Sequence, residues 1–178
     1  MEPKTLLEAV RHFSDLDVCH ACMVKLKWPD GRIVCPKCGG DRVGNIASRR
    51  MLQCKTKGCR KQFSAKVGTI FEDSPLGLDK WFVAVWAIAK NGISSMEVHR
   101  ALGITQKTAW FMLHRIRLAM RTMTFERLHG VDEESWRLNN RRFDDGARFE
   151  QVMQRVLGRR ITCRLLCAID DAGFMGIS

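Results

Sequence analysis

The sequence lacks the features that would place the chain in a membrane or outside the cell. No apolar stretch reaches about 18 residues, so no transmembrane helix is predicted. The polar start, Met1–Lys4, runs into a helical pattern and shows no secretory signal. Internal repeats and low-complexity tracts are also lacking, and 46% hydrophobic with 28% charged residues is typical of folded proteins. The 178 residues therefore predict one or two folded domains in the cytoplasm, where thiols stay reduced.

Acidic residues are nearly absent from one part of the chain. Residues 35–66 contain nine Lys or Arg and one Asp, a net charge of +8. Residues 93–127 contain six basic and two acidic residues, a net charge of +4, whereas residues 67–92 between them have a net charge of −1. Positive charge gathered in two blocks favours a polyanionic partner, most simply nucleic acid. The alternative is an ordinary solvated basic surface.

Four of the eight cysteines form two short-spaced pairs. Two residues separate Cys35 from Cys38, fifteen residues follow, and four residues separate Cys54 from Cys59. Two such pairs let one chain offer four thiolates to a tetrahedral zinc ion. The spacing therefore predicts structural zinc as a cofactor, and no catalysis at the metal because a four-thiolate site is closed.

The residues around these pairs favour a zinc ribbon. Gly39 and Gly40 allow the sharp turn that follows the second cysteine of a zinc knuckle. Residues 42–46 and 50–54 are long enough for a hairpin between the pairs. Disulfides are the alternative, which a cytoplasmic chain disfavours. The other thiols are expected to be ordinary buried residues: Cys19, Cys22, Cys163 and Cys167. The first two of these could instead form the partner pair of Cys35 and Cys38.

Outside the cysteine region the hydrophobic periodicity is helical. Residues 5–27 predict helix with a break near Ser14, and residues 79–90 predict a broadly apolar helix at the centre of a core. Further along the chain, residues 147–157 predict a helix with one apolar side, formed by Phe149, Val152, Met153 and Val156.

Residues 93–121 predict a helix-turn-helix. Ser94 and Glu97 match a capping box, Gly103 supplies a left-handed turn, and Thr105 caps the second helix. The second helix has a separate cationic face, so its N-terminal end can enter a DNA major groove. Its inward stripe is Ala109, Leu113, Ile116 and Met120. The alternative is a plain pair of antiparallel helices with a charged outer face.

The candidate DNA-contacting residues form two groups. Base edges are expected near the start of the second helix, at Thr105, Gln106, Lys107 and Thr108. Phosphates are expected further along it, at His114, Arg115, Arg117 and Arg121. The cysteine region adds phosphate contacts at Arg49, Arg50, Lys55, Lys57, Arg60 and Lys61. Trp110 is expected to be partly core rather than a stacking platform.

Several stretches of this sequence resemble one protein family. They are residues 27–31, 35–39, 59–64, 68–74, 80–82 and 107–117. They are similar to bacterial insertion-sequence transposases that place a zinc ribbon and a helix-turn-helix ahead of an RNase H-like DDE core. The resemblance covers about residues 13–121. It implies that the N-terminal part recognises element ends, with zinc ligands at Cys35, Cys38, Cys54 and Cys59.

The remaining residues depart from that family pattern. Residues 136–142 and 148–149 resemble the extreme C-terminal end of the family, and only about residues 122–130 bridge the two matching regions. The resemblance therefore implies an internally deleted transposase without its catalytic core. Two Mg²⁺ ions would need carboxylates that converge from a rigid scaffold. The acidic residues after residue 121 are mostly adjacent pairs, which seldom converge, so no catalytic residue is predicted and Mg²⁺ is expected only with a core.

The predicted fold class is mainly α with a small β zinc ribbon, followed by a helix-turn-helix bundle and a short helical tail. The predicted divisions are an N-terminal helical segment at 1–32, the ribbon at 33–70, a DNA-binding domain at 71–125 and a family C-terminal remnant at 126–178. The leading hypothesis is a sequence-specific protein that binds double-stranded DNA at transposable-element ends, associated with the nucleoid and without catalysis of its own. It could form homo-oligomers or pair with a full-length transposase. Alternatives are an active DDE transposase and a zinc-stabilised interaction module.

Overall fold

The computed structural model describes residues 3–90, 92–121 and 142–157. Within these ranges the protein has six helices and one three-stranded sheet. The helices are α1 (Leu6–His12), α2 (Leu16–Lys27), α3 (Leu78–Lys90), α4 (Ser95–Leu102), α5 (Gln106–Arg121) and α7 (Asp145–Leu157). The strands are β1 (Val43–Ile46), β2 (Met51–Cys54) and β3 (Gln62–Phe63). The predicted class, mainly helical with a small sheet, is confirmed.

The break in the N-terminal helical segment lies where the sequence predicts it. Thr5 caps α1, which ends at Phe13. Asp15 caps α2, because its side chain accepts hydrogen bonds from the backbone N–H groups of Asp17 and Val18. Two capped starts within twelve residues divide the segment into two helices that can pack at different angles.

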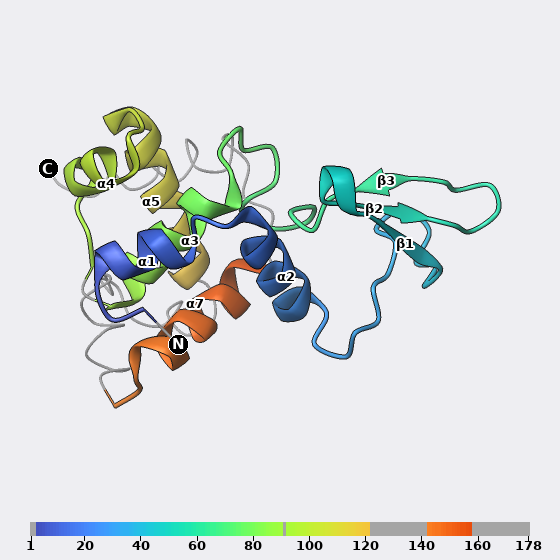
Figure 1. Ribbon diagram of the computed structural model, residues 1–178, viewed down its shortest axis with the longest axis horizontal. Coiled ribbons are helices and arrows are strands. Elements are labelled where there is room, and N and C mark those ends of the chain that lie inside the picture. Colours follow the sequence, from blue (N-terminus) through green and yellow to red (C-terminus); the bar gives the residue numbers. More distant parts are fainter. Residues whose placement is uncertain (1–2, 91, 122–141, 158–178) are drawn as a thin grey trace, which may run out of the picture.

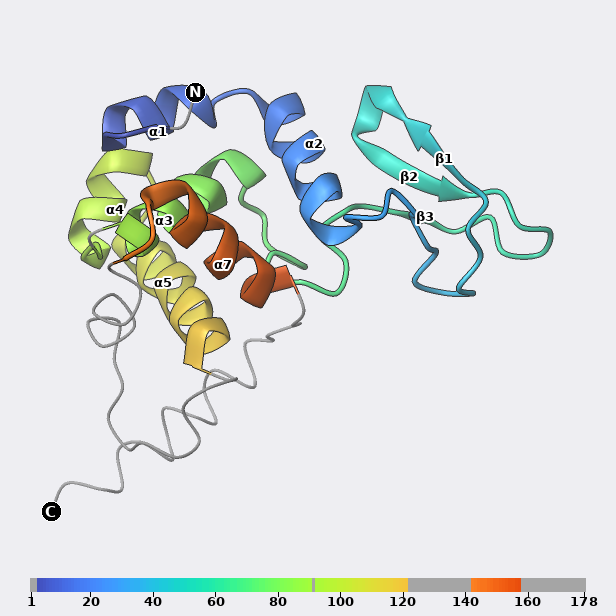
Figure 2. The same ribbon diagram turned by 90° about the horizontal axis from the view of Figure 1, so that it is seen from below.

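Helix α3 forms the centre of the helical body (Figures 1 and 2). Every residue from Trp81 to Ala89 is buried, so the helix is apolar on all sides. Such a helix is stable only when neighbours cover its whole circumference. Helices α1, α2, α5 and α7 contact it, and their apolar faces form one continuous core with it.

Helix α7 belongs to this core although it lies far along the chain. It starts at Asp145, two residues before the predicted start, and the predicted apolar side, which includes Phe149 and Val152, is buried. The Phe149 ring stacks on Phe13, with centroids 5.5 Å apart, and meets Phe82 edge-on at 5.9 Å. Lys90 on α3 pairs with Asp145 at 3.1 Å. The start of α7 is therefore fixed against the end of α3.

The three strands form a separate antiparallel sheet in the order β1-β2-β3. Cys54 pairs with Val43 across β1, and Leu52 pairs with Phe63 across β3. Burial alternates along β2, where Leu52 and Cys54 point inward. Figures 1 and 2 place this sheet at the opposite end of the molecule from α4. Trp28, at the end of α2, packs against both the helical core and the small core of the sheet.

The two hydrophobic cores can be compared with the predicted divisions of the chain, although they do not fix the boundaries of those divisions. Helices from the predicted segments 1–32, 71–125 and 126–178 share one core, whereas the sheet has a core of its own. Residues 122–141 and 158–178 lie outside the described residues, and with them the predictions for Cys163 and Cys167. Among the described residues, no helix is both long enough and apolar enough to cross a bilayer.

Replacing Phe149 with alanine tests the docking of α7. Because the ring is 8% exposed and contacts two other aromatic rings, Phe149→Ala should lower the free energy of unfolding by about 3–5 kcal/mol. The matched control is Phe143→Ala, since that ring is 46% exposed and its removal should change stability by less than about 0.5 kcal/mol. Urea denaturation followed by circular dichroism measures both changes. Equal effects of the two substitutions would contradict the docking.

Candidate metal centre and nucleic-acid interface

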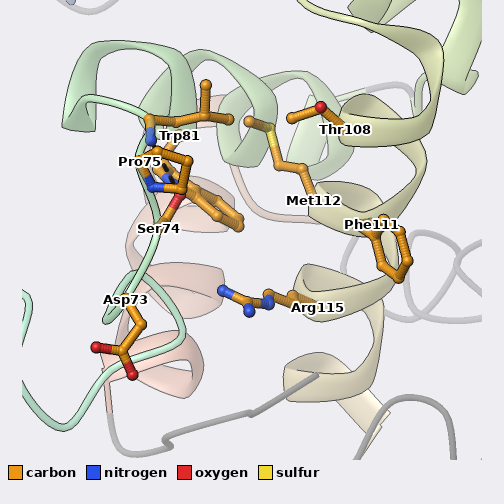
Figure 3. Close-up of a pocket in the computed structure, with 9 residues that line it drawn as sticks. Asp73, Ser74, Pro75, Trp81, Thr108, Phe111, Met112 and Arg115 are labelled. Carbon is orange, nitrogen blue, oxygen red and sulfur yellow. Dashed lines mark hydrogen bonds between the residues drawn. The ribbon is translucent and has the colours of Figure 1, made fainter. Parts of the chain in front are cut away.

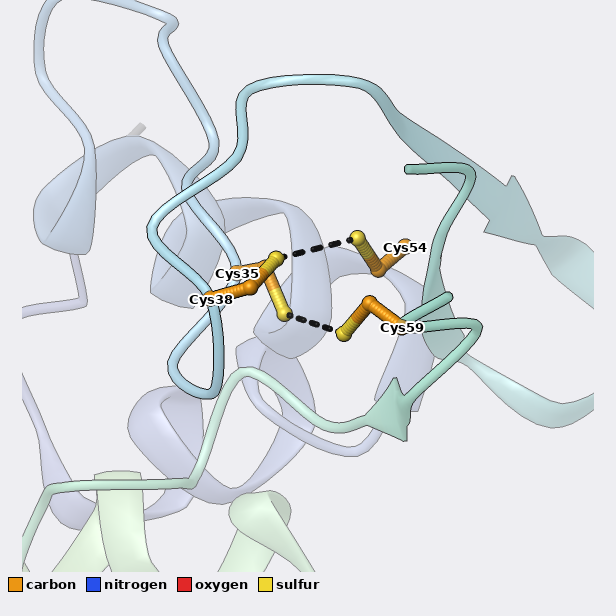
Figure 4. Close-up of side chains that lie close together, drawn as sticks. All are labelled: Cys35, Cys38, Cys54 and Cys59. Atoms are coloured by element: carbon orange, nitrogen blue, oxygen red, sulfur yellow. Dashed lines mark hydrogen bonds between the residues drawn. The ribbon is translucent and has the colours of Figure 1, made fainter. Parts of the chain in front are cut away.

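The four predicted zinc ligands come together at one end of the sheet (Figure 4). The sulfur atoms of Cys35, Cys38, Cys54 and Cys59 all lie within 4.8 Å of one another. The Cys35 and Cys59 sulfurs are 3.7 Å apart, and those of Cys38 and Cys54 are 3.6 Å apart. Within the part of the chain that the structure describes, this is the one group of three or more potential ligands that converges.

Two tight turns aim the sulfurs at a common point. In the first, Gly39 has φ +69° and its N–H donates to the Cys35 carbonyl at 2.8 Å, while the Cys35 N–H donates to the Gly40 carbonyl at 2.9 Å. In the second, Gly58 has φ +81° and the Cys59 N–H donates to the Thr56 carbonyl at 3.1 Å. Glycine takes these positive φ values without strain. The turn at Gly39 and Gly40, which follows Cys38, is the one that the sequence predicts.

The electrostatics of the cluster call for a cation. Hydrogen bonds from the Thr56 hydroxyl and backbone lower the pKa of the Cys54 thiol to about 7. A backbone hydrogen bond from Lys61 lowers the pKa of Cys59, but desolvation and the neighbouring thiols outweigh it and raise that pKa to about 11. The opposite shifts of these two pKa values show that the thiols are coupled, so ionisation of one disfavours ionisation of its neighbours. Only a bound cation lets all four carry charge at neutral pH.

The donor set and its dimensions fit zinc. A Zn–S bond of about 2.3 Å places the sulfurs of a regular tetrahedron about 3.8 Å apart. Two of the six sulfur–sulfur separations, 3.7 Å and 3.6 Å, agree with that edge, and all six are within 4.8 Å. Four thiolates leave no open coordination position, so zinc here would stabilise the ribbon and would not activate water.

Two lysines join the ribbon to the helical body, a role that the sequence analysis predicted for neither of them. The Lys27 ammonium, at the end of α2, donates to the carbonyls of Ala65, at 3.0 Å, and Val67. The Lys66 ammonium donates to the Leu76 carbonyl at 2.7 Å. Burial lowers the pKa of both lysines. Their lysine identity gave no signal of this role, since the acceptors are backbone carbonyls that only the folded chain brings near.

All six predicted phosphate contacts on the ribbon are exposed cations. They are Arg49, Arg50, Lys55, Lys57, Arg60 and Lys61. Arg50 differs from the others because its guanidinium pairs with the Asp17 carboxylate on α2. Both groups are largely exposed, at 43% and 72%, so this pair is worth little to stability. It positions Arg50 beside α2.

Helices α4 and α5 are joined by a tight turn at the predicted position. The Ser94 side chain accepts from the Glu97 N–H, and the Glu97 carboxylate accepts from the Ser94 N–H, which completes the capping box. Gly103 ends α4 with φ +58°, in the left-handed region. Thr105 then caps α5 by accepting from the Thr108 N–H at 3.2 Å. The predicted inward stripe of α5 is buried: Ala109, Leu113, Ile116 and Met120.

The outer face of α5 differs in one respect from its prediction. Gln106 and Lys107 are exposed, as expected, and His114 is half-buried. Trp110, however, is 39% exposed and lies outside the helical core, so the expectation that it is partly core is wrong. Its ring contacts Phe111 and His114 of the same helix, with centroids 5.1 Å and 3.9 Å away. Periodicity alone could not separate an exposed tryptophan from a core one.

Two predicted phosphate contacts on α5 are engaged with the protein backbone. The half-buried Arg115 donates to the Ile70 carbonyl at 3.2 Å, and Arg117 donates to the Ile93 carbonyl at 3.3 Å. Both guanidinium groups therefore join α5 to segments that precede it in the chain. The side chain of Arg121 lies outside the described residues.

A hollow of about 230 Å³ lies between α5 and the loop before α3 (Figure 3). From α5 it is lined by Thr108, Phe111, Met112 and Arg115. From the other side it is lined by Asp73, Ser74, Pro75, Leu76 and Trp81. The Trp81 indole N–H donates to the Ser74 hydroxyl at 3.0 Å, which holds this loop against α3. Of the predicted DNA contacts, Thr108 and Arg115 thus lie on the flank of α5 that faces this loop.

The ribbon region matches a known family of domains. Residues 15–62 match the transposase zinc-ribbon domain of the IS1595 type, a stretch that includes all four clustered cysteines. That segment of the chain is therefore similar to the zinc ribbons of transposases. It is 28% identical over 99 residues to an uncharacterized protein in the transposable element ISH50 of Halobacterium salinarum. That stretch covers 55% of this chain and 33% of the relative, so the chain spans about a third of the relative's length. No solved structure matches the chain.

The family match is informative about the role of each cysteine in the matched region. The match to a transposase zinc ribbon supports the four converging thiols as a possible zinc site, and the glycine turns that place them agree with this assignment. Cys19 and Cys22 lie within the matched residues but outside the cluster. The Cys19 thiol is fully buried and donates to the Phe13 carbonyl at 3.2 Å, and burial raises its pKa to about 12. Cys19 is therefore a packing residue, as predicted.

Substituting one clustered cysteine tests the metal assignment. Cys38→Ser removes one of four ligands, so the purified chain should lose its bound zinc, from about one ion per chain to a small fraction. Elemental analysis after gel filtration measures the zinc content. The matched control is Cys22→Ser, which changes a thiol on α2 outside the cluster and should retain the full zinc content. Equal zinc content in both variants would rule out the assignment.

Proposed function

We propose that this chain binds duplex DNA at the ends of an insertion-sequence-type element. The observation that carries the proposal is the set of exposed cations around the converging cysteines of a transposase zinc ribbon. Residues 35–66 have a net charge of +8, which a closed zinc site with four thiolates would only partly offset. Like charges packed this closely repel one another, and the phosphates of a nucleic acid relieve that repulsion.

The second proposed DNA contact is α5. Its capped start, the tight turn at Gly103 and the exposed Gln106 and Lys107 suit insertion of the N-terminal half into a major groove. The ribbon supplies contacts that depend on charge, and α5 supplies contacts that depend on base sequence. Because the ribbon and α4 lie at opposite ends of the molecule (Figure 1), the two surfaces would contact separate stretches of DNA.

We do not propose that this chain cleaves DNA strands on its own. Two of the acidic groups considered for it have structural partners: Asp144 caps α7 by accepting from the Ala147 N–H at 2.7 Å, and Asp145 pairs with Lys90 and Arg148. A carboxylate that holds a helix start is poorly placed to bind a catalytic metal. Incubation with Mg²⁺ and supercoiled element-end DNA should therefore leave the DNA uncut, and nicking lost in Asp144→Asn would overturn this part.

Two alanine substitutions test the DNA-binding proposal. Duplexes selected from a random library by the intact protein serve as probes, and fluorescence anisotropy measures affinity between low and physiological salt. Arg60→Ala should weaken binding to every duplex alike and reduce the slope of log affinity against log salt by about one. Lys107→Ala should weaken binding to the selected sequences by about 1–3 kcal/mol and leave non-specific binding nearly unchanged.

The matched control removes a cation that belongs neither to the ribbon nor to α5. Lys25 is an exposed lysine on α2, and Lys25→Ala should leave both affinity and salt slope unchanged. Binding that is weakened equally by all three substitutions would indicate a general charge effect. Absence of any salt-sensitive binding to duplex DNA by the zinc-loaded protein would refute the proposal.

A further inference from the structure

The outer face of α5 carries one large apolar side chain among polar ones. Trp110 lies between the exposed Lys107, one turn before it, and His114, one turn after it. Residues three and four positions apart share one side of a helix. Among the exposed large hydrophobic residues of the described chain, Trp110 is the one on α5.

Packing of the helical body does not explain why position 110 carries a tryptophan. Its neighbour Phe111 packs against the core, whereas the indole itself lies outside that core. The ring contacts of the indole are with its own helix, Phe111 edge-on and His114 at 3.9 Å. These two rings restrict the orientation of the indole on the outer face. A rigid aromatic group on a helix surface is well suited to meet a partner, because binding costs it little conformational entropy.

The neighbouring arginines are less suited to reading bases. Arg115 and Arg117 each donate to a backbone carbonyl of another segment, Ile70 and Ile93, so their guanidinium groups are engaged close to the body. Losing those hydrogen bonds would offset the gain from a new contact to a base. The base-facing part of α5 is therefore the exposed group of Gln106, Lys107 and Trp110.

We propose that Trp110 reads the C5-methyl group of a thymine in the major groove, which rests on the proposed function of α5 as the DNA-contacting helix. The stacked bases of a duplex offer no ring face to an inserted helix. Among the groups that base edges display in the major groove, the thymine methyl is the apolar one. The exposed indole gains by covering that methyl group, and a uracil or cytosine at the same position leaves it against water. Trp110 is thus a specificity-determining residue beside the charged Lys107.

The test removes the methyl group from the DNA before any change to the protein. Duplexes selected by the intact protein are resynthesised with deoxyuridine in place of each thymine in turn, which deletes one methyl group and keeps every hydrogen-bonding group. The intact protein should lose affinity about fourfold at one or two of these positions, the value for one buried methyl-sized group. Equal affinity for the thymine and uracil duplexes at every position would overturn the inference.

Two variants then assign the effect to Trp110. Trp110→Ala should bind the thymine and uracil duplexes equally, whereas the control Lys107→Ala should bind both more weakly and keep the ratio between them. Trp110→Phe retains an apolar ring without the indole N–H and should keep most of the ratio. A ratio that survives in Trp110→Ala would assign the methyl contact to another residue and overturn the inference. Failure of the selection itself, with no duplex preferred, would instead remove the proposed function on which the inference rests.

Discussion

Four cysteine sulfur atoms lie so close together in the ribbon that they would repel one another when ionised. Only a bound cation can offset that repulsion. Cys35, Cys38, Cys54 and Cys59 lie within 4.8 Å of one another, a distance at which four thiolates are stable only around a cation. Two of them, Cys35 and Cys54, are also half of the small buried core, which they share with Leu52 and Phe63. Because so few buried residues cannot hold three short strands together, we expect metal binding and folding of the ribbon to be one process.

The cationic surface follows from this arrangement. A closed zinc site would hold the ribbon without any contribution from Lys57 and Arg60 to its small core, and both side chains are exposed. The helical body supplies the rest of the framework: α3 is buried all round, and α5 rests on it through Ala109, Leu113 and Ile116. Trp28 packs against both the helical core and the small core of the sheet. Packed side chains therefore connect α5 to the ribbon.

Sequence patterns predicted the local features and missed the distant ones. Cysteine spacing gave the ligand set, and Ser94, Glu97 and Gly103 gave the start and end of α4, since each signal lies within a few residues of its effect. The packing of Phe149 on Phe13 joins residues 136 positions apart, and no local period encodes it. The same holds for Arg115, whose acceptor is the backbone carbonyl of Ile70. The exposure of Trp110 depends on which face of α5 the rest of the body covers.

If a zinc-held ribbon contacts DNA, the affinity of one preparation for DNA must depend on its zinc content, which can be compared in three states. Anisotropy with a selected duplex is measured for the zinc-loaded chain, after removal of zinc by a chelator, and after zinc is added back. Affinity should fall at least about tenfold on zinc removal, because the ribbon unfolds and its phosphate contacts are lost, and it should return with zinc. Unchanged affinity in the zinc-free chain would show that DNA binding does not require a metal-held ribbon.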